Sequence, residues 1–198
     1  TDSIVGRGAS GIVRRATLTR RSGATEQVAA KMLAAGASER DVQKFAKEYE
    51  LSLAAAQQCT GTCRIYGCVS VDGALCLVMK LYAGDLAQRL DARRDAADTR
   101  IALPLREACR YLLQIAQSLV ELHAMGICVQ DLKPSNLLVD EAGRLVVADF
   151  GIALLAEATL TSTATQTGGG AGTVYYMAPE QHDSEEFGKV TPKADIWA

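Results

Sequence analysis

Hydrophobic and polar residues follow two different patterns along this chain. In the first part, apolar residues come in short runs bounded by glycines and polar turns, which is typical of strands. Strands are predicted over residues 12–18, 27–33, 65–71 and 75–81. Asp72 and Gly73 separate the last two and form a hairpin turn signal. The pattern predicts two hairpins of an antiparallel sheet.

One helix interrupts this strand-rich part. Ser38 and Asp41 have the spacing of a capping box, and the periodicity after them predicts a helix that continues to Gln57. Its expected apolar face is formed by Val42, Phe45, Tyr49 and Leu53.

The second part is mainly helical. A short helix is predicted over residues 85–94, a polar loop over 95–100 and a long buried helix over 105–125, ended by Gly126. The long helix carries Leu105, Leu112, Ile115, Leu119 and Leu122. Short apolar runs at 137–139 and 145–148 predict two more strands, and residues 157–174 have the composition of a mobile loop. Strands first and helices second indicate an α+β fold in two lobes with a cleft between them, divided near residues 82–84.

Composition restricts the function classes. The chain has 198 residues, of which 48% are hydrophobic and 22% charged, as in a soluble globular protein. A net charge of −2 gives no general affinity for nucleic acid or anionic membranes, and no apolar run is long enough to span a bilayer. No signal peptide opens the chain.

The six cysteines are scattered, and Cys59, Cys63 and Cys68 are close enough in sequence to suggest a metal site. Neither spacing is the CxxC pair typical of zinc, and both histidines are far away. Reduced thiols are therefore favoured over a zinc site or disulfides.

The most specific motif lies between residues 129 and 151. Asp131, Lys133 and Asn136 stand close together, and Asp149 follows thirteen residues after Asn136, directly before Phe150 and Gly151. They supply a base, a cation and two oxygen ligands for Mg²⁺, which are the groups that phosphoryl transfer needs. The alternative interpretation is a capped polar turn, in which Asp and Asn are common.

A second motif opens the chain, where residues 6–13 read GxGxxGxV. Glycines let backbone amides approach phosphate oxygens closely. A dinucleotide-binding loop would need a helix after Gly11, whereas residues 12–18 look like a strand, and the Gly-Lys-Ser/Thr of a Walker A loop is absent. A plain hairpin turn remains an alternative.

Together, the segments around Asp131 and Asp149 resemble the catalytic and metal-binding loops of eukaryotic protein kinases. Lys133 to Asn136 match the serine/threonine form, and residues 81–86 give a similarity to the tyrosine-kinase-like group. The resemblance implies a two-lobed protein-kinase-like fold, with an N-lobe of antiparallel sheet plus one helix at 1–82 and a mainly helical partial C-lobe at 83–198. We expect a kinase-domain fragment, because the chain stops where the central C-lobe helix should begin, and a cytoplasmic, intracellular protein.

The resemblance also implies roles for the polar residues. Asp131 would accept the proton of the substrate hydroxyl, while Lys133 would stabilise charge on the transferring phosphate. Lys31, in a Val-Ala-Ala-Lys strand, would contact the phosphates of ATP and pair with Glu48, with Glu50 as the alternative partner. The Mg²⁺ ligands would be Asn136 and Asp149.

The implied ATP site draws on both lobes. Its expected residues are Gly6, Arg7, Gly8, Ala9, Ser10, Gly11, Val13, Ala29, Lys31, Met79, Lys80, Tyr82 and Leu138. Thr173 and the Ala-Pro-Glu of residues 178–180 resemble a peptide-docking segment, and Asp195 resembles the residue that braces the catalytic loop. The implied function is ATP-dependent phosphorylation of Ser/Thr hydroxyls on protein substrates. An ATP-binding pseudokinase scaffold and a kinase of small molecules are the alternatives.

One departure from the family pattern has a mechanistic consequence. Val129 and Gln130 occupy the positions of His and Arg before the catalytic Asp. That Arg normally pairs with a phosphorylated residue of the activation loop, and Gln has no charge to do so. We therefore hypothesise that activity does not depend on this form of switching.

Overall fold

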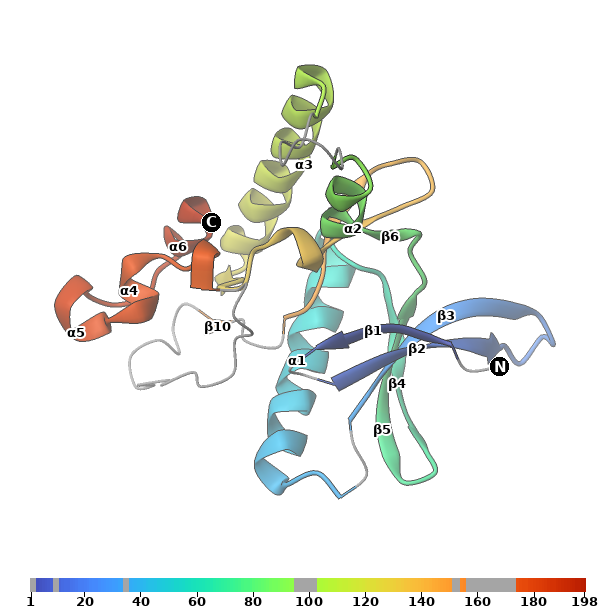
Figure 1. Ribbon diagram of the computed structural model, residues 1–198. Helices are drawn as coiled ribbons and strands as arrows, with labels where there is room; N and C mark the ends of the chain where they lie inside the picture. Colours follow the sequence, from blue (N-terminus) through green and yellow to red (C-terminus); the bar gives the residue numbers. More distant parts are fainter. Residues whose placement is uncertain (1–2, 9–10, 34–35, 95–102, 151–153, 156–173) are drawn as a thin grey trace.

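The computed structural model describes residues 3–8, 11–33, 36–94, 103–150, 154–155 and 174–198, and these form two parts (Figure 1). The first part is a five-stranded antiparallel sheet with one long helix, α1, along its side. The second part is mainly helical. The predicted α+β architecture is confirmed, whereas a lobe boundary after residue 82 stays a prediction.

The sheet has the strand order β1-β2-β3-β5-β4 with every neighbouring pair antiparallel. Its strands are β1 (Ile4–Gly8), β2 (Gly11–Thr19), β3 (Thr25–Met32), β4 (Ile65–Val71) and β5 (Ala74–Lys80). The four predicted strands therefore lie within two residues of those observed. Asp72 and Gly73 form the turn between β4 and β5 and both have positive φ.

Helix α1 (Glu39–Gln58) begins at the predicted capping box, since the Ser38 hydroxyl accepts from the Asp41 amide. Its predicted apolar face was wrong in part. Phe45 is buried, but Val42 is 37% exposed, and the buried face includes Glu48. The helix turns this polar residue inward because a buried lysine on β3 compensates its charge, which hydrophobic periodicity alone does not reveal.

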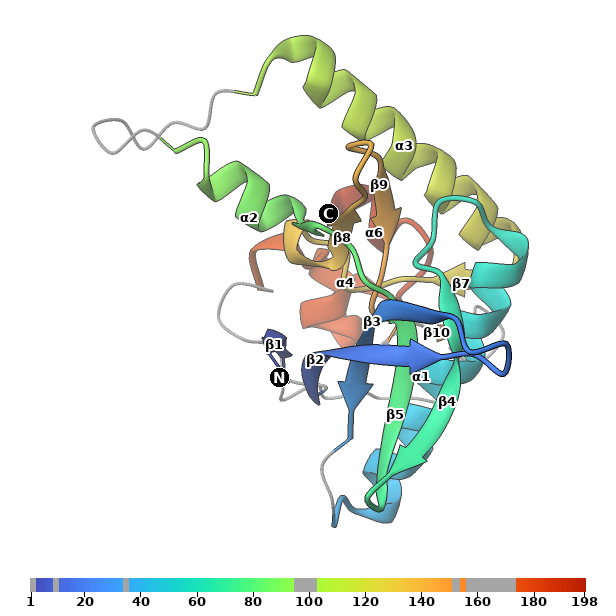
Figure 2. The same ribbon diagram turned by 90° about the vertical axis from the view of Figure 1, so that its right-hand side faces the viewer.

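The second part contains one long helix, a shorter helix and several elements of two to four residues. Helices α2 (Leu86–Asp91) and α3 (Leu105–Ala124) flank the hairpin of β8 (Leu137–Val139) and β9 (Leu145–Val147), as Figure 2 shows. The short elements are β6 (Gly84–Asp85), β7 (Ile127–Cys128), η1 (Pro134–Asn136), β10 (Leu154–Leu155), η3 (Val174–Tyr176), α4 (Pro179–His182), α5 (Ser184–Phe187) and α6 (Ala194–Trp197). Among the described residues, no helix combines the length and apolar character needed to cross a bilayer.

The prediction that α3 is buried along its length was wrong. Leu119 and Leu122 lie in the core, but Leu105 is 79% and Leu112 65% exposed. The core side of α3 instead includes Tyr111, and Figure 1 shows the first turns of the helix extending beyond the other elements. A helix can bury only the stripe that faces a neighbour, and its first turns have few neighbours here.

The segment after α1 joins the two parts of the molecule. The carboxylate of Glu121 on α3 accepts from the Thr60 amide at 2.7 Å and from its hydroxyl at 3.0 Å. Gly61 lies so close to α3 that a Cβ there would be 1.9 Å from the Ser118 hydroxyl. The Val147 amide of β9 donates to the Gly61 carbonyl at 2.8 Å. These contacts fix the end of α1 against α3 and β9.

The cysteines behave as small apolar side chains or surface thiols. All six are free; Cys68 and Cys109 are exposed, whereas the other four are buried. Cys59 lies in the core cluster, with its Sγ 3.4 Å from Met125 Sδ. The three residues considered for a metal site therefore do not share one environment.

Helices α2 and α3 are linked through Glu107. Its carboxylate accepts from Arg93 at 2.6 Å and from the Tyr111 hydroxyl at 2.7 Å, and lies 3.4 Å from Arg89. The hydrogen bond from Arg93 and then the one from Tyr111 lower the pKa of Glu107 from 4.5 to about 2.

Replacing Glu107 by Gln is expected to lower the melting temperature at pH 7 but to matter less in acid. A folded-state pKa below the unfolded value contributes stability that is present above pH 4.5 and is lost as pH falls toward about 2. Melting temperatures of parent and variant should therefore converge between these values. A gap independent of pH would contradict the ion-pair explanation, and Glu50→Gln on the exposed side of α1 is the control.

Candidate active site

Lys31 lies at the centre of the candidate site. It is on β3, is only 5% exposed, and its Nζ donates to Glu48 Oε1 and to Asp149 Oδ1, the latter at 3.0 Å. Glu50, the alternative partner, is exposed on α1. Burial lowers the pKa of Lys31, but the charges of Asp149 and Glu48 outweigh it, and the net effect is a raised pKa. The lysine is therefore a cation held between two carboxylates.

The register of the sheet brings the predicted nucleotide-binding residues to one face. Val13 on β2 and Leu77 on β5 both stand opposite Lys31, and Met79 stands opposite Ala29. Directly opposed residues, and residues two apart in a strand, project to the same side. Val13, Ala29, Lys31 and Met79 thus form one surface on the face that carries the lysine.

The strand end after Met79 is held by its own contacts. The Lys80 amide donates to the Arg64 carbonyl at 2.9 Å, and Tyr82 accepts from the Arg64 amide through its hydroxyl at 3.2 Å. The Lys80 N–H therefore already has an acceptor and is not available to an adenine edge. Leu138, predicted from the other lobe, is half-buried at the centre of β8.

The glycine-rich segment is a hairpin of β1 and β2, in which Gly6 pairs with Val13, Arg7 with Ile12 and Gly8 with Gly11. Gly11 has a φ of +135°, and a Cβ there would lie 2.6 Å from the carbonyl oxygen of Met32. Only glycine fits this close approach of two backbones. Ala9 and Ser10 lie outside the described residues.

Asp131 is oriented by its two neighbours in the catalytic segment. Its Oδ2 accepts from Lys133 Nζ at 2.6 Å and from Asn136 Nδ2 at 2.9 Å. Its Oδ1 is buried and has no hydrogen-bond partner within the part of the chain that the structure describes. A buried carboxylate oxygen without a donor is the group that an incoming hydroxyl would satisfy.

Asn136 and Asp149 lie at the same end of the β8–β9 hairpin. Leu137 pairs with Val147, and the Ala148 amide donates to the Asn136 carbonyl at 2.9 Å. Asp149 itself has a φ of 62°, uncommon for a residue other than glycine. One carboxylate and one amide oxygen, completed by phosphate oxygens, suit Mg²⁺, which is usually held by few protein ligands. The residues present therefore fit the implied cation.

Asp195 on α6 holds the backbone before Asp131. Its carboxylate accepts from the Val129 amide at 2.9 Å and the Gln130 amide at 2.7 Å, and it lies 2.8 Å from His123 Nε2. Gln181 Nε2 donates to the Gln130 carbonyl at 2.8 Å. Sequence reasoning missed His123 and Gln181, since their partners are 72 and 51 residues away and no local motif signals such contacts.

Replacing Asp195 by Ala should reduce both stability and catalysis. The change leaves the amides of Val129 and Gln130 without their acceptor, in a place where Asp195 itself is only 2% exposed. Each unsatisfied amide should lower the free energy of unfolding by about 1–3 kcal/mol. Chemical denaturation and a phosphotransfer assay would measure the two effects. Asp195→Asn, which keeps one acceptor oxygen, should retain more of both, and equal damage by the two variants would argue against the bracing role.

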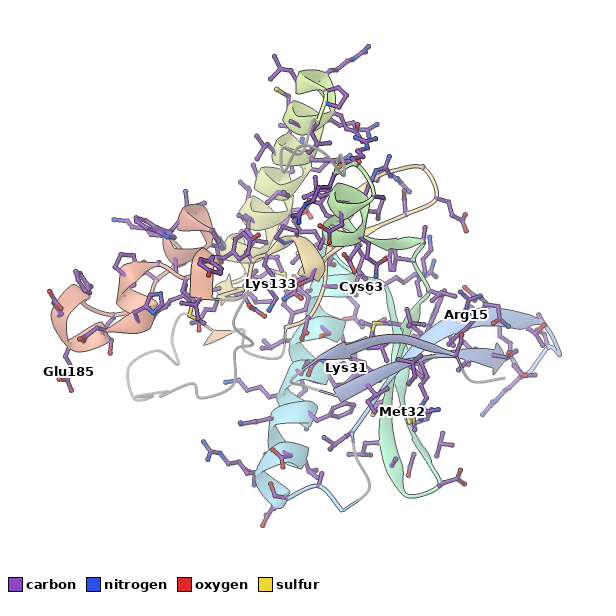
Figure 3. All side chains as sticks on the ribbon, in the orientation of Figure 1. Arg15, Lys31, Met32, Cys63, Lys133 and Glu185 are labelled. Atoms are coloured by element: carbon purple, nitrogen blue, oxygen red, sulfur yellow. The ribbon has the colours of Figure 1, made fainter. Side chains whose placement is uncertain are left out.

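Several predicted residues fall outside the described part of the chain. They include Gly151, Thr173 and the serine and threonine residues of 161–167. Of the Ala-Pro-Glu segment, Ala178 is buried and Pro179 begins α4. The structure thus brings together Lys31, Glu48 and Asp149, and separately Asp131, Lys133 and Asn136, with the two groups adjoining through Ala148. Figure 3 labels Lys31 on the sheet and Lys133 on the segment after β7.

Comparison with known proteins bears on this arrangement. The family model for the protein kinase domain matches residues 1–198. The serine/threonine-protein kinase PknE of Mycobacterium tuberculosis is 34% identical over 196 residues, covering 98% of this chain and 32% of PknE. Mitogen-activated protein kinase kinase 2 of Arabidopsis thaliana is 28% identical over 197 residues, which cover 98% of this chain and 49% of that kinase. The E3 ubiquitin-protein ligase KEG of Arabidopsis thaliana is 30% identical over 174 residues, which cover 80% of this chain and 10% of KEG. The chain spans less than half the length of each of these relatives.

Proposed function

Because this chain belongs to the protein kinase family, we propose that it transfers the γ-phosphoryl group of ATP to serine or threonine hydroxyls of protein substrates. The observation that carries the proposal is a continuous series of contacts. Lys31 donates hydrogen bonds to Glu48 and Asp149. The amide of Ala148, the residue before Asp149, donates to the Asn136 carbonyl, and the Asn136 side chain donates to Asp131. The residues that we propose as phosphate-binding cation, metal ligands and base are therefore linked by contacts.

In the proposed mechanism, each residue has a separate task. The glycine hairpin and Lys31 position the phosphates, and Asp131 accepts a hydrogen bond from the substrate hydroxyl through Oδ1. Lys133, 2.6 Å from Asp131, supplies positive charge beside the group that is transferred. Mg²⁺, when held by Asn136 and Asp149, would neutralise charge on the phosphate oxygens. The serine/threonine preference follows from residues 133–136 and from the named kinases among the relatives.

The test is transfer of labelled phosphate from ATP to a generic protein such as casein, with and without Mg²⁺. We expect Mg²⁺-dependent labelling, and phosphoamino acid analysis should show phosphoserine or phosphothreonine. ATP binding without transfer would instead support the pseudokinase alternative. Labelling of free small alcohols but not of proteins would support a small-molecule kinase. Six free thiols and the use of ATP are consistent with an intracellular location, which we include in the proposal.

We further infer that the catalytic segment is positioned without a phosphorylated residue. Gln130 has a φ of 64°, and Asp195 and Gln181 already bind its N–H and carbonyl groups. Its uncharged Nε2 is buried, with no partner among the described residues.

Replacing Thr161, Ser162, Thr163, Thr165 and Thr167 together by Ala should therefore leave phosphotransfer close to the parent level. The same assay with the quintuple variant checks this expectation, with Asp131→Asn as the inactive reference. A loss approaching that of the reference would mean that a modified residue in this loop is required.

A further inference from the structure

A groove lined by arginines lies between α2 and α3, apart from the Lys31–Asp149 site. We call it the arginine groove. It is open to solvent, has a volume of about 670 Å³, and is lined by Arg89, Arg93, Pro104, Arg106, Glu107 and Arg110. Four guanidinium groups stand against one carboxylate, in a chain whose net charge is −2. The lining of the groove therefore carries an excess of positive charge, although the chain as a whole is slightly negative.

Three of the four arginines of the groove are held in place by neighbouring side chains. Glu107 binds Arg93 at 2.6 Å and lies 3.4 Å from Arg89. The guanidinium groups of Arg89 and Arg110 also stack near the ring of Tyr111, at 5.9 and 5.3 Å from its centroid. Preorganised guanidinium groups lose little side-chain entropy when a ligand binds.

The groove retains binding capacity after these internal contacts. Arg106 and Arg110 are exposed, and neither has an ion-pair partner among the described residues. Arg89 and Arg93 are about one-third exposed. The β8–β9 turn borders the groove, since a side chain at Gly143 would lie 3.7 Å from Arg110 and 3.8 Å from Arg89. A guanidinium fork matches carboxylate and phosphate oxygens, which it can bind through two parallel hydrogen bonds.

The groove is formed by other residues than the proposed catalytic site. It lies at the first turns of α3, whereas the opposite end of this 20-residue helix leads into β7 and the catalytic segment. None of the residues that line the groove belongs to the Lys31–Asp149 site. A ligand in the groove therefore leaves that site unoccupied.

We propose that the arginine groove binds an acidic peptide segment of a protein partner, through carboxylate or phosphate groups on that segment. A protein partner is favoured because the ligand must enter a groove between two helices, and because the proposed activity already acts on proteins. Binding itself requires no phosphotransfer, so it can be measured without ATP and judged independently of the proposed function.

The experiment is fluorescence anisotropy with three labelled dodecapeptides of alternating residues: Glu-Ser, the same peptide with phosphoserine, and neutral Gln-Ser. We expect binding of one or both acidic peptides, weakened by salt, and no binding of the neutral one. The double variant Arg106→Gln/Arg110→Gln should weaken binding about fivefold or more. The matched control Arg21→Gln/Arg40→Gln, which removes the same charge from exposed positions elsewhere, should bind as the parent does.

The outcomes separate the possible ligands. Binding of the phosphopeptide alone would support the proposal and assign phosphate as the anion. The proposal would be overturned if neither acidic peptide binds, or if both double variants weaken binding equally. It would also be overturned if vesicles containing phosphatidylserine bind through Arg106 and Arg110 while the peptides do not. Circular dichroism melting curves should show that both double variants remain folded, since all four positions are exposed.

Discussion

Replacing Asp131 by Asn is expected to lower kcat for phosphotransfer by roughly 10²–10⁴-fold, the usual contribution of a positioned base. Asn keeps the shape and one carbonyl oxygen, but it cannot take a proton or carry the negative charge that faces Lys133 at 2.6 Å. The affinity for ATP should change little, because the predicted phosphate contacts come from Lys31 and the glycine hairpin. Steady-state kinetics and a nucleotide-binding titration would measure the two quantities.

The control for this prediction is Asp72→Asn in the exposed turn between β4 and β5. It makes the same chemical change far from the site, at a positive φ that Asn tolerates. If Asp131→Asn were as active as this control, Asp131 would not be the base. The unpartnered Oδ1 would then need another explanation.

The second large effect is expected from Lys31→Met, which removes the cation between Glu48 and Asp149. Loss of a charged group that stabilises the transition state costs about 10²–10³-fold in kcat. The fold should suffer as well, because leaving one charge of a buried pair uncompensated costs about 3–5 kcal/mol. Glu48 carries most of this cost, since its side chain is 5% exposed and that of Asp149 is 36% exposed.

A double variant distinguishes the two roles of Lys31. Lys31→Met/Glu48→Leu removes the unpaired carboxylate, so urea denaturation should show stability recovering toward the parent value, while phosphotransfer stays low. Glu50→Gln, two residues along the same helix and exposed, should affect neither quantity. Recovery of activity in the double variant would show that Lys31 matters for folding alone.

Features that depend on residues close together in the sequence were predicted better than features that depend on packing between distant elements. Four of the five strands of the sheet were predicted within two residues, β1 was not predicted as a strand, and the capping box of α1 was correct. These features depend on alternation and on local hydrogen bonds, which neighbouring residues determine. By contrast, the buried faces of α1 and α3 were predicted only in part, because burial depends on which elements pack against a helix.

In the candidate site, too, contacts within one loop could be predicted from the sequence, whereas contacts between elements could not. The spacing of Asp131, Lys133 and Asn136 places them in one short loop, so their contacts could be anticipated from the sequence. The choice between Glu48 and Glu50 as the partner of Lys31 rested on resemblance, and the rotation of α1 against the sheet decides which carboxylate is buried.

By itself, the sequence determined the order of strands and helices, the loop that carries Asp131 and the glycine hairpin, because short-range periodicity and spacing encode them. Only the tertiary structure decided that Asp195 and Gln181 hold Gln130, that Asp149 reaches Lys31, and that four arginines from α2, the turn after it and α3 line one groove. These contacts join residues far apart in the chain. Their formation depends on how whole elements pack, and no local pattern records that packing.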